Sequence, residues 1–230
     1  MIGNKEAREV LPAGLYGITA EKFSDGRSNI QVVEQMIKGG IKIIQYREKQ
    51  PSKSYSTILE ECRQIRELTR AAGITFIVND IVDVALLVDA DGVHVGQDDL
   101  PVGEVRKLLG NDKIVGLSTH SPKQAEDAVL AGADYIGVGP IFATKTKDDV
   151  CDPVGFSYLD WVASNISLPF VAIGGIKLHN VGHIVQRGAK TICLVTEIVG
   201  APDIIARIHE IDRALSGCKT NLNVVENLIV

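Results

Sequence analysis

Short apolar runs alternate with longer amphipathic segments along almost the whole chain. The apolar runs are four to six residues long and rich in Val and Ile, which is typical of buried strands. We therefore predict strands at residues 14–19, 41–45, 74–78, 92–95, 113–117, 135–138, 170–173 and 191–195. Apolar residues at helical spacing predict helices at residues 29–38, 51–72, 82–88, 122–131, 156–164, 181–187 and 202–215, with a further helix starting at Pro101.

Strands that are apolar on both faces and separated by helices are typical of a parallel sheet. Eight such units within 230 residues predict a single-domain α/β protein with the closed (β/α)8 TIM barrel fold. A doubly wound open sheet is the alternative. Its dinucleotide-binding form is disfavoured, because no GxGxxG motif follows the first strand. Residues 1–13 are predicted to be an irregular lead-in, and residues 216–230 a C-terminal tail.

Composition narrows the function classes without changing the predicted fold. A net charge of -5 and the lack of a long basic run disfavour a nucleic-acid-binding surface. No apolar stretch approaches the ~20 residues that a membrane-spanning helix needs. The four cysteines form no CxxC pair and no signal peptide is evident, so we expect free thiols in a cytoplasmic protein.

Polar and charged residues gather where the predicted strands end. In closed (β/α)8 barrels the carboxyl ends of the strands carry the reactive residues, so this pattern predicts an enzyme. Asp80 and Asp99 follow two neighbouring strands. Two carboxylates beside phosphate-binding cations favour a Mg²⁺ site. In the structural alternative, Asp80 is a helix N-cap and Asp99 belongs to a turn.

Five consecutive residues at the end of the second predicted strand combine an amide with two cations. Side chains alternate along an extended chain, so Gln45, Arg47 and Lys49 point one way and Tyr46 and Glu48 the other. Arg47 and Lys49 suit a phosphate-bearing ligand. The alternative is a solvated charged loop.

A second phosphate site is predicted further along the chain. Gly174 and Gly175 follow the seventh predicted strand, where glycine lets backbone N–H groups approach an anion closely. A tight turn is the alternative. Val195 and Thr196 follow the eighth strand, at a second position where barrels commonly bind phosphate. The loop 144–147 carries two threonines and two lysines that could close over an anion, or form an ordinary exposed loop.

Two histidines and a serine are interpreted from their positions alone. His94 lies inside a predicted strand and is interpreted as a hydrogen-bonded core residue. His120 lies at a strand end and is a secondary functional candidate. Ser118 has no evident His–Asp partnership in the sequence, so we interpret it as a hydrogen-bond donor rather than a nucleophile.

The segments at these strand ends together resemble thiamine phosphate synthase. They occupy residues 45–49, 79–80, 91–101, 116–121, 137–147 and 172–176, and the resemblance spans about residues 14–215. It implies that hydroxymethylpyrimidine pyrophosphate and hydroxyethylthiazole phosphate combine to give thiamine phosphate and pyrophosphate. Pyrophosphate would leave in a dissociative step, after which the thiazole nitrogen captures the pyrimidine cation. Such chemistry needs stabilised leaving-group charge and two aligned substrates.

The resemblance also implies roles for particular residues and a Mg²⁺ cofactor held by Asp80 and Asp99. The residues implied to hold the pyrimidine pyrophosphate are Gln45, Tyr46, Arg47, Glu48, Lys49, Asn79, Ser118 and Lys147, of which Arg47, Lys49, Ser118 and Lys147 would assist catalysis. The residues implied to hold the thiazole phosphate are Thr144, Lys145, Thr146, Gly175, Val195 and Thr196. The loop departs from the family pattern at Ala143, where the family often has proline.

Two alternatives use the same kind of barrel. A thiazole tautomerase would share a histidine near the place of His120, but it is not expected to keep the Mg²⁺ and pyrophosphate residues. A non-catalytic phosphate-binding regulator would lack a metal carboxylate or a leaving-group cation. The sequence has the whole set, which favours the synthase. The expected partners are small-molecule substrates, without nucleic acid or membrane, and the oligomeric state is left open.

Overall fold

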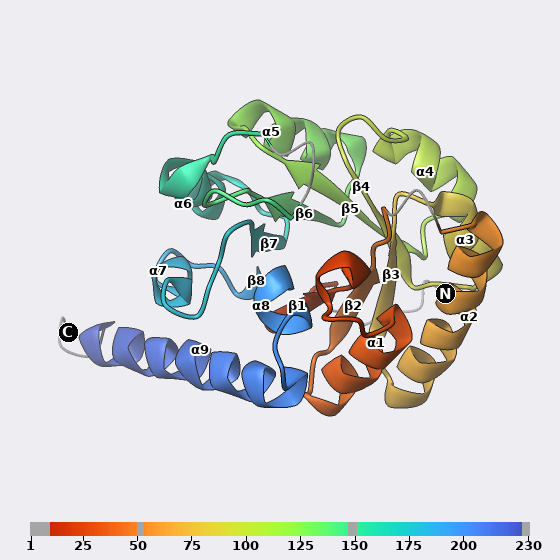
Figure 1. The fold of residues 1–230 in the computed structure, drawn as a ribbon. Helices are drawn as coiled ribbons and strands as arrows, with labels where there is room; N and C mark the ends of the chain where they lie inside the picture. The colour runs from red at the N-terminus through yellow and green to blue at the C-terminus, as the bar shows by residue number, and fades with distance from the viewer. Residues whose placement is uncertain (1–9, 50–52, 147–150, 227–230) are drawn as a thin grey trace, which may run out of the picture.

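A computed structural model of the chain describes residues 10–49, 53–146 and 151–226. Eight parallel strands close into a barrel in sequence order, and helices surround it (Figure 1). The strands are β1 (Gly14–Ile18), β2 (Ile43–Tyr46), β3 (Thr75–Asn79), β4 (Gly92–Val95), β5 (Ile114–Thr119), β6 (Tyr135–Val138), β7 (Phe170–Ile173) and β8 (Thr191–Cys193). The predicted (β/α)8 barrel is confirmed.

Helices follow the strands along the chain. They are the 3-10 helix η1 (Glu21–Phe23) and the α-helices α1 (Asn29–Lys38), α2 (Tyr55–Ala72), α3 (Val82–Leu87), α4 (Val102–Leu109), α5 (Pro122–Ala131), α6 (Gly155–Asn165), α7 (Val181–Val185), α8 (Val195–Val199) and α9 (Ile204–Glu226). Helices of the described residues are all either too short or too polar to cross a lipid bilayer.

Local sequence signals set several helix ends where they were predicted. Ser28 caps α1 through a capping box with Gln31. Ser121 caps α5, which opens with Pro122 and ends at Gly132 with a φ of +80°. These caps turn the chain sharply between helix and strand, so each unit packs back onto the barrel.

Among the helices, two predicted boundaries differ most from the structure. The second helix begins at Tyr55 and is capped by Ser54, rather than beginning at residue 51; residues 51 and 52 lie outside the described residues. The last helix continues to Glu226, so residues 216–226, predicted to be a tail, extend α9. A single Gly217 costs only about 1 kcal/mol in a helix, too little to end it. In Figure 1 the far end of α9 projects past α7 and beyond the barrel.

The barrel buries apolar side chains in two layers. Tyr16, Ile43, Ile77 and Tyr135 belong to a cluster in the barrel interior. A larger cluster lies between the strands and the surrounding helices. Because side chains alternate along each strand, every second residue continues the interior layer toward the carboxyl ends of the strands. The interior layer therefore leads directly to the predicted site.

Candidate active site

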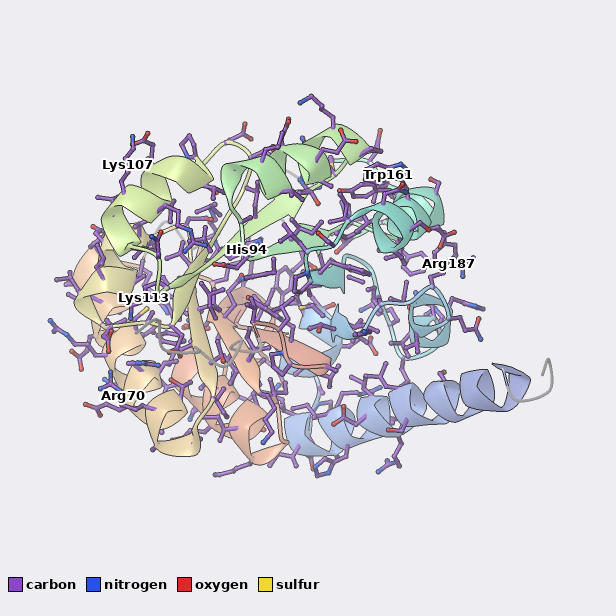
Figure 2. The ribbon with its side chains drawn as sticks, turned by 180° about the vertical axis from the view of Figure 1, so that it is seen from behind. Arg70, His94, Lys107, Lys113, Trp161 and Arg187 are labelled. Carbon is purple, nitrogen blue, oxygen red and sulfur yellow. The ribbon has the colours of Figure 1, made fainter. Side chains whose placement is uncertain are left out.

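The carboxyl ends of the strands bring the predicted polar residues together at one mouth of the barrel. Ile43 and Ile77 lie in the interior cluster, so Gln45 and Asn79, two positions further along the same strands, face the same side. Asn79 pairs in register with His94 of β4. Figure 2 shows His94 within the barrel rather than among the outer helices. Residues from separate predicted strand ends thus share one interior face.

Asp80 is the residue around which charged groups meet at this mouth. Its Oδ2 lies 2.6 Å from the Nζ of Lys49, and the carboxyl group of Asp99 is within hydrogen-bonding reach. Burial raises the pKa of Asp80, the Lys49 ammonium opposes that rise, and Asp99 adds to it. Two carboxylates held this close favour a cation between them.

The alternative structural roles predicted for Asp80 and Asp99, a helix N-cap and a turn residue, hold for only one of the two. Helix α3 has Ile81 at its N-cap and no capping side-chain hydrogen bond, so Asp80 does not cap it. Asp99 does accept the backbone N–H of Gly96 at 2.7 Å, as a turn residue would. Within the described residues, no group of three or more His, Cys, Asp or Glu side chains forms a ready metal site. The mouth offers two carboxylates, Asp80 and Asp99, close to each other.

The predicted alternation after β2 is confirmed. The Tyr46 hydroxyl donates to Oε2 of Glu61 at 2.6 Å, on the helix side of the strand. Glu48 accepts from Nδ2 of Asn29 at 3.1 Å and lies 3.3 Å from Nζ of Lys53. The side chains of Tyr46 and Glu48 therefore face α1 and α2. Contact of these two side chains with a pyrimidine substrate, expected from the family resemblance, is not consistent with that placement.

Thr19 fixes the backbone of the segment that carries the cations. Its hydroxyl accepts the Arg47 N–H at 2.8 Å and donates to the Arg47 carbonyl at 3.2 Å. Thr19 is fully buried, so these bonds form in a site that excludes water. Thr19 directly follows β1 but was not among the predicted site residues. Arg47 and Lys49 thus extend from a braced segment rather than from a free loop.

A row of polar side chains crosses the barrel interior. Gln45 Nε2 donates to the Tyr16 hydroxyl at 3.0 Å, and the hydroxyls of Tyr16 and Tyr135 lie 2.8 Å apart. His94 Nδ1 lies 2.9 Å from the Tyr135 hydroxyl, and His94 Nε2 lies 2.9 Å from Oγ of Ser118. The interpretation of His94 as a hydrogen-bonded residue is confirmed, whereas Ser118 has the histidine partner that the sequence did not reveal. We call these five residues the interior chain.

Gly174 and Gly175 form a turn that a neighbouring loop approaches closely. Their φ values are +98° and +64°, in the left-handed region that favours glycine. The Phe142 N–H donates to the Gly174 carbonyl at 2.9 Å. A Cβ at position 175 would lie only 2.6 Å from the carbonyl oxygen of Ala143. The two glycines therefore allow the loop after β6 to pack against the end of β7.

Hydroxyl groups and one unexpected lysine complete this side of the mouth. The Oγ1 atoms of Thr144 and Thr146 lie 3.0 Å apart. Lys177, just after the glycine turn, donates from Nζ to Oγ1 of Thr196 at 3.0 Å. Lys177 was not among the predicted site residues, because it lies two positions beyond the glycine turn and not directly after a strand.

The remaining predicted positions are placed as follows. Val195 opens α8 and does not end the last strand, since β8 stops at Cys193. Lys145 is exposed on its loop, and Lys147 lies outside the described residues. His120 is held at the mouth by two contacts. Its ring Nδ1 lies 2.5 Å from the Gly139 carbonyl oxygen, and its backbone N–H donates to Oε1 of Gln124.

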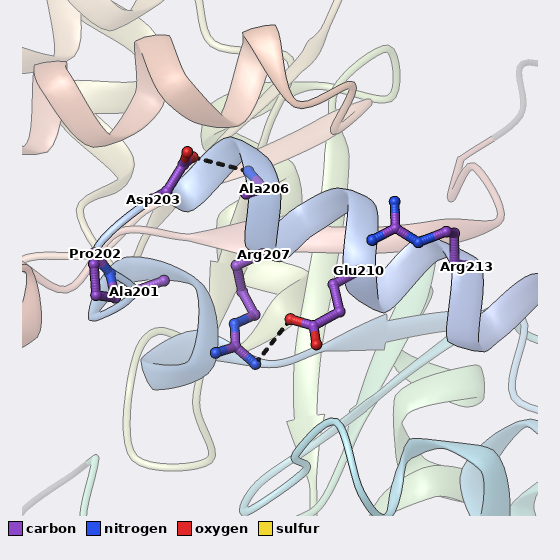
Figure 3. Close-up of a pocket in the computed structure, with 7 residues that line it drawn as sticks. All are labelled: Ala201, Pro202, Asp203, Ala206, Arg207, Glu210 and Arg213. Carbon is purple, nitrogen blue, oxygen red and sulfur yellow. Dashed lines mark hydrogen bonds and ion pairs between the residues drawn. The ribbon is translucent and has the colours of Figure 1, made fainter.

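A surface hollow of about 360 Å³ lies away from these residues, along the start of α9 (Figure 3). Arg207 and Glu210, which line it, pair with each other at 3.2 Å. None of its lining residues is a predicted site residue. The mouth of the barrel, where the chemistry-bearing side chains converge, remains the candidate active site.

A closed (β/α)8 barrel with paired carboxylates, a strand-end lysine and a glycine turn at one mouth defines a barrel enzyme that acts on phosphorylated substrates. The family model described as thiamine monophosphate synthase matches residues 15–198. The chain belongs to the thiamine monophosphate synthase family.

Individual relatives agree with the family model. The chain is 62% identical over 217 residues to the thiamine-phosphate synthase of Pelotomaculum thermopropionicum, a match covering 94% of this chain and 98% of the relative. It is 58% identical to that of Lawsonia intracellularis, with coverage of 89% and 94%. A solved thiamine phosphate pyrophosphorylase from Pyrococcus furiosus superposes with a TM-score of 0.81 at 30% identity, covering 90% of this chain and 96% of that one.

Proposed function

We propose that this protein is a thiamine-phosphate synthase, joining hydroxymethylpyrimidine pyrophosphate to hydroxyethylthiazole phosphate with release of pyrophosphate. Family membership supports this activity. The observation that carries it is the meeting of Asp80 with Lys49 and Asp99 at the barrel mouth. These groups supply what a departing pyrophosphate needs, namely a cation and a place for a divalent metal. The comparisons lend no support to the tautomerase or to the regulator.

The donor set fits Mg²⁺, and Asp80 and Asp99 are the residues that would hold it. Carboxylate oxygens are hard ligands, and Mg²⁺ takes one or two of them while it keeps water and phosphate oxygens. When bound, the ion would neutralise charge on the pyrophosphate. Burial and the nearby Asp99 raise the pKa of Asp80, and Lys49 opposes that rise, so a bound cation would likewise favour the ionised form of Asp80.

The chain's own residues would then stabilise the leaving group and hold the reacting atoms in line. In a dissociative step negative charge builds up on the pyrophosphate, so fixed donors lower the barrier. Arg47 and Lys49 extend from the braced segment after β2, and Ser118 offers a hydroxyl from β5. Because the interior face of β2 also carries Gln45, the pyrimidine and its pyrophosphate would lie along one side of the mouth.

The thiazole phosphate would occupy the other side of the mouth. Gly175 and Thr196 follow β7 and β8, and Lys177 adds an ammonium group 3.0 Å from Thr196 Oγ1. Thr144 and Thr146 add hydroxyl groups from the loop after β6. A phosphate group held there would point the thiazole ring toward the pyrimidine. The two reacting atoms would then already be aligned, which lowers the entropic cost of the coupling.

The test is to supply the purified protein with each substrate alone and with both, in Mg²⁺ and after chelation, and to measure pyrophosphate and thiamine phosphate. Both products should form only with both substrates and Mg²⁺. Asp99→Asn should abolish most of this activity, while Asp98→Asn, the exposed neighbouring carboxylate, should keep it. Pyrophosphate release at the same rate with and without Mg²⁺ would contradict the assignment of Asp80 and Asp99 as metal ligands. Isomerisation of a carboxylated thiazole phosphate, without coupling, would point to the tautomerase and to His120.

The proposal includes a cytoplasmic setting and small-molecule partners. All four cysteines are free thiols in the structure, in line with a reducing compartment. Fractionation of the source cells, with the coupling activity as the marker, tests the location directly.

A further inference from the structure

We infer that His94 is a positioning residue that fixes the direction in which the Ser118 hydroxyl donates, through the interior chain of Gln45, Tyr16, Tyr135, His94 and Ser118. The inference rests on the proposed function. It adds His94, which contacts Ser118 from the barrel interior, on the side away from the proposed substrate. The chain joins strands β1, β2, β4, β5 and β6, so it spans the barrel floor beneath the mouth.

The barrel is built to accommodate this chain. In the strand register, Gly116 stands between His94 and Tyr135. A Cβ at position 116 would lie 2.2 Å from Tyr135 Cζ and 2.6 Å from His94 Nδ1. Gly137 leaves room on the other side, since a Cβ there would lie 3.4 Å from His94 Cε1. The two rings can meet only because position 116 carries no side chain, whereas a Cβ at position 137 would make ordinary contact with His94.

The order of donors and acceptors gives the chain one direction. The Nε2 amide group of Gln45 can only donate, so the Tyr16 oxygen accepts. Either tyrosine hydroxyl could donate to the other, but the Tyr16 proton stays hydrogen-bonded within the interior chain only if it goes to Tyr135, and this is the direction inferred here. Tyr135 then donates its proton to Nδ1 of His94. The remaining proton of a neutral imidazole therefore lies on Nε2, which donates to Oγ of Ser118.

This direction matters for the chemistry of the mouth. Because Ser118 accepts from His94, its own proton is left to donate away from the ring, toward the leaving pyrophosphate. The opposite direction would make Ser118 donate to His94, the arrangement of an activated nucleophile. Burial raises the pKa of both tyrosines, so both hydroxyls keep the protons that the chain transmits. A Ser118 hydroxyl that already points toward the leaving pyrophosphate does not have to rotate when negative charge develops there in the transition state.

The direction is tested by ¹⁵N NMR of protein labelled at its five histidines, with His94 assigned by its absence in His94→Gln. The inferred state is a neutral ring with a protonated Nε2 and an unprotonated Nδ1. A ring protonated at Nδ1, or at both nitrogens, overturns the inference. This measurement uses the wild-type protein without substrate, so it does not depend on the proposed function.

Kinetics test whether His94 acts through Ser118. The amide nitrogen of His94→Gln can replace Nε2, whereas the shorter His94→Asn can replace only Nδ1, so the two variants form a matched pair. Loss of one transition-state donor costs roughly 100-fold in kcat, and we expect that for Ser118→Ala. His94→Asn should lose about tenfold in kcat with unchanged KM, and His94→Gln should recover most of it.

The double variant separates a positioning role from a structural one. His94→Asn combined with Ser118→Ala should be within about twofold of Ser118→Ala alone, because the histidine has no serine left to direct. Losses that multiply would overturn the inference. If the wild type makes no thiamine phosphate, the proposed function fails whatever the NMR result. If the wild type is active and Nδ1 carries the proton, only the inference fails.

Discussion

Lys53 is the cation of a buried acidic cluster behind the second strand, and Lys53→Met tests how that cluster supports the site. Its Nζ lies 2.7 Å from Glu61 and 3.3 Å from Glu48, and it also pairs with Glu21. The side chains of Lys53 and Glu48 are only 10% and 3% exposed. Methionine keeps much of the aliphatic stem but leaves the three carboxylates without their ammonium group.

The size of the effect follows from these exposures. Removing one partner of a buried ion pair costs about 3–5 kcal/mol, because the other charge stays buried without a partner. Glu21 and Glu61 are 28% and 13% exposed and can regain water, so we expect the lower end, about 3 kcal/mol. In a chain of 230 residues this is a fall in Tm of roughly 6–12 °C.

The assay is thermal unfolding by circular dichroism at pH 7 and pH 5. Burial lowers the pKa of Lys53, but hydrogen bonds to Glu21 and Glu61 outweigh burial and raise it above the ordinary value. Lys53 itself therefore stays protonated in both the folded and the unfolded state between pH 5 and 7, and its own titration adds no pH dependence in that range. In Lys53→Met the unpaired carboxylates bind protons more readily when folded than when unfolded. The stability deficit should consequently shrink as the pH falls.

Lys123→Met is the matched control. Lys123 pairs with Asp127 on the surface of α5, with side chains 76% and 51% exposed. Such a pair contributes less than about 0.5 kcal/mol, so the control should melt within a degree or two of the wild type. If Lys53→Met loses no more than Lys123→Met, or if its deficit grows toward pH 5, the acidic cluster does not stabilise the fold in the way argued.

Three further predictions concern the mouth and the interior. Asp99→Asn should lower kcat roughly 100-fold at ordinary Mg²⁺, with partial recovery in a Mg²⁺ titration, because a metal carboxylate is lost. Gly175→Ala should raise the KM for the thiazole phosphate roughly tenfold, since the new Cβ would lie 2.6 Å from the Ala143 carbonyl oxygen. Gly116→Ala should reduce the free energy of unfolding in urea by about 1–3 kcal/mol, because its Cβ would collide with Tyr135.

Two of these predictions have a counterpart variant that should behave differently, and the third has an outcome that would contradict it. Asp98→Asn changes an exposed carboxylate and should leave the Mg²⁺ dependence intact. Gly103→Ala adds a Cβ in open space within α4 and should stabilise the protein by up to about 1 kcal/mol. A change in KM for the pyrimidine substrate alone, in Gly175→Ala, would show that the two phosphate sites are reversed.

The sequence predicted the barrel because its signals are local. Each strand is a short apolar run, and caps such as Ser28 and Ser121 mark the helices that follow. Strand ends were less accurate: the apolar run that begins at Ile41 packs against the helix layer before β2 starts at Ile43. Apolar runs report burial, whereas a strand is defined by its hydrogen bonds, and the two need not begin together.

Only those features of the candidate site that follow from barrel geometry could be predicted from the sequence. Parallel strands share one carboxyl end, so Asp80 and Asp99 could be expected to meet without knowledge of their contacts. The bond between Tyr16 and Tyr135 joins residues 119 positions apart, and only closure of the barrel brings them together. The His94–Ser118 contact likewise depends on the register between neighbouring strands and on Gly116, which leaves space for the His94 ring, and no local pattern encodes it.

The five residues at the end of β2 show how a single strand can serve both the chemistry and the fold. Gln45 reaches the interior chain, while Tyr46 and Glu48 bind the polar groups behind the strand. Strand alternation therefore separates two kinds of expected mutational effect within one short motif. Changes at 47 or 49 should alter kinetics with little loss of stability, whereas changes at 46 or 48 should lower stability first. A change at 45 should do both, because Gln45 is buried and donates to Tyr16. If all five positions proved invariant among relatives, two separate constraints would be needed to explain it. Catalysis would explain positions 45, 47 and 49, and packing behind the strand would explain positions 46 and 48.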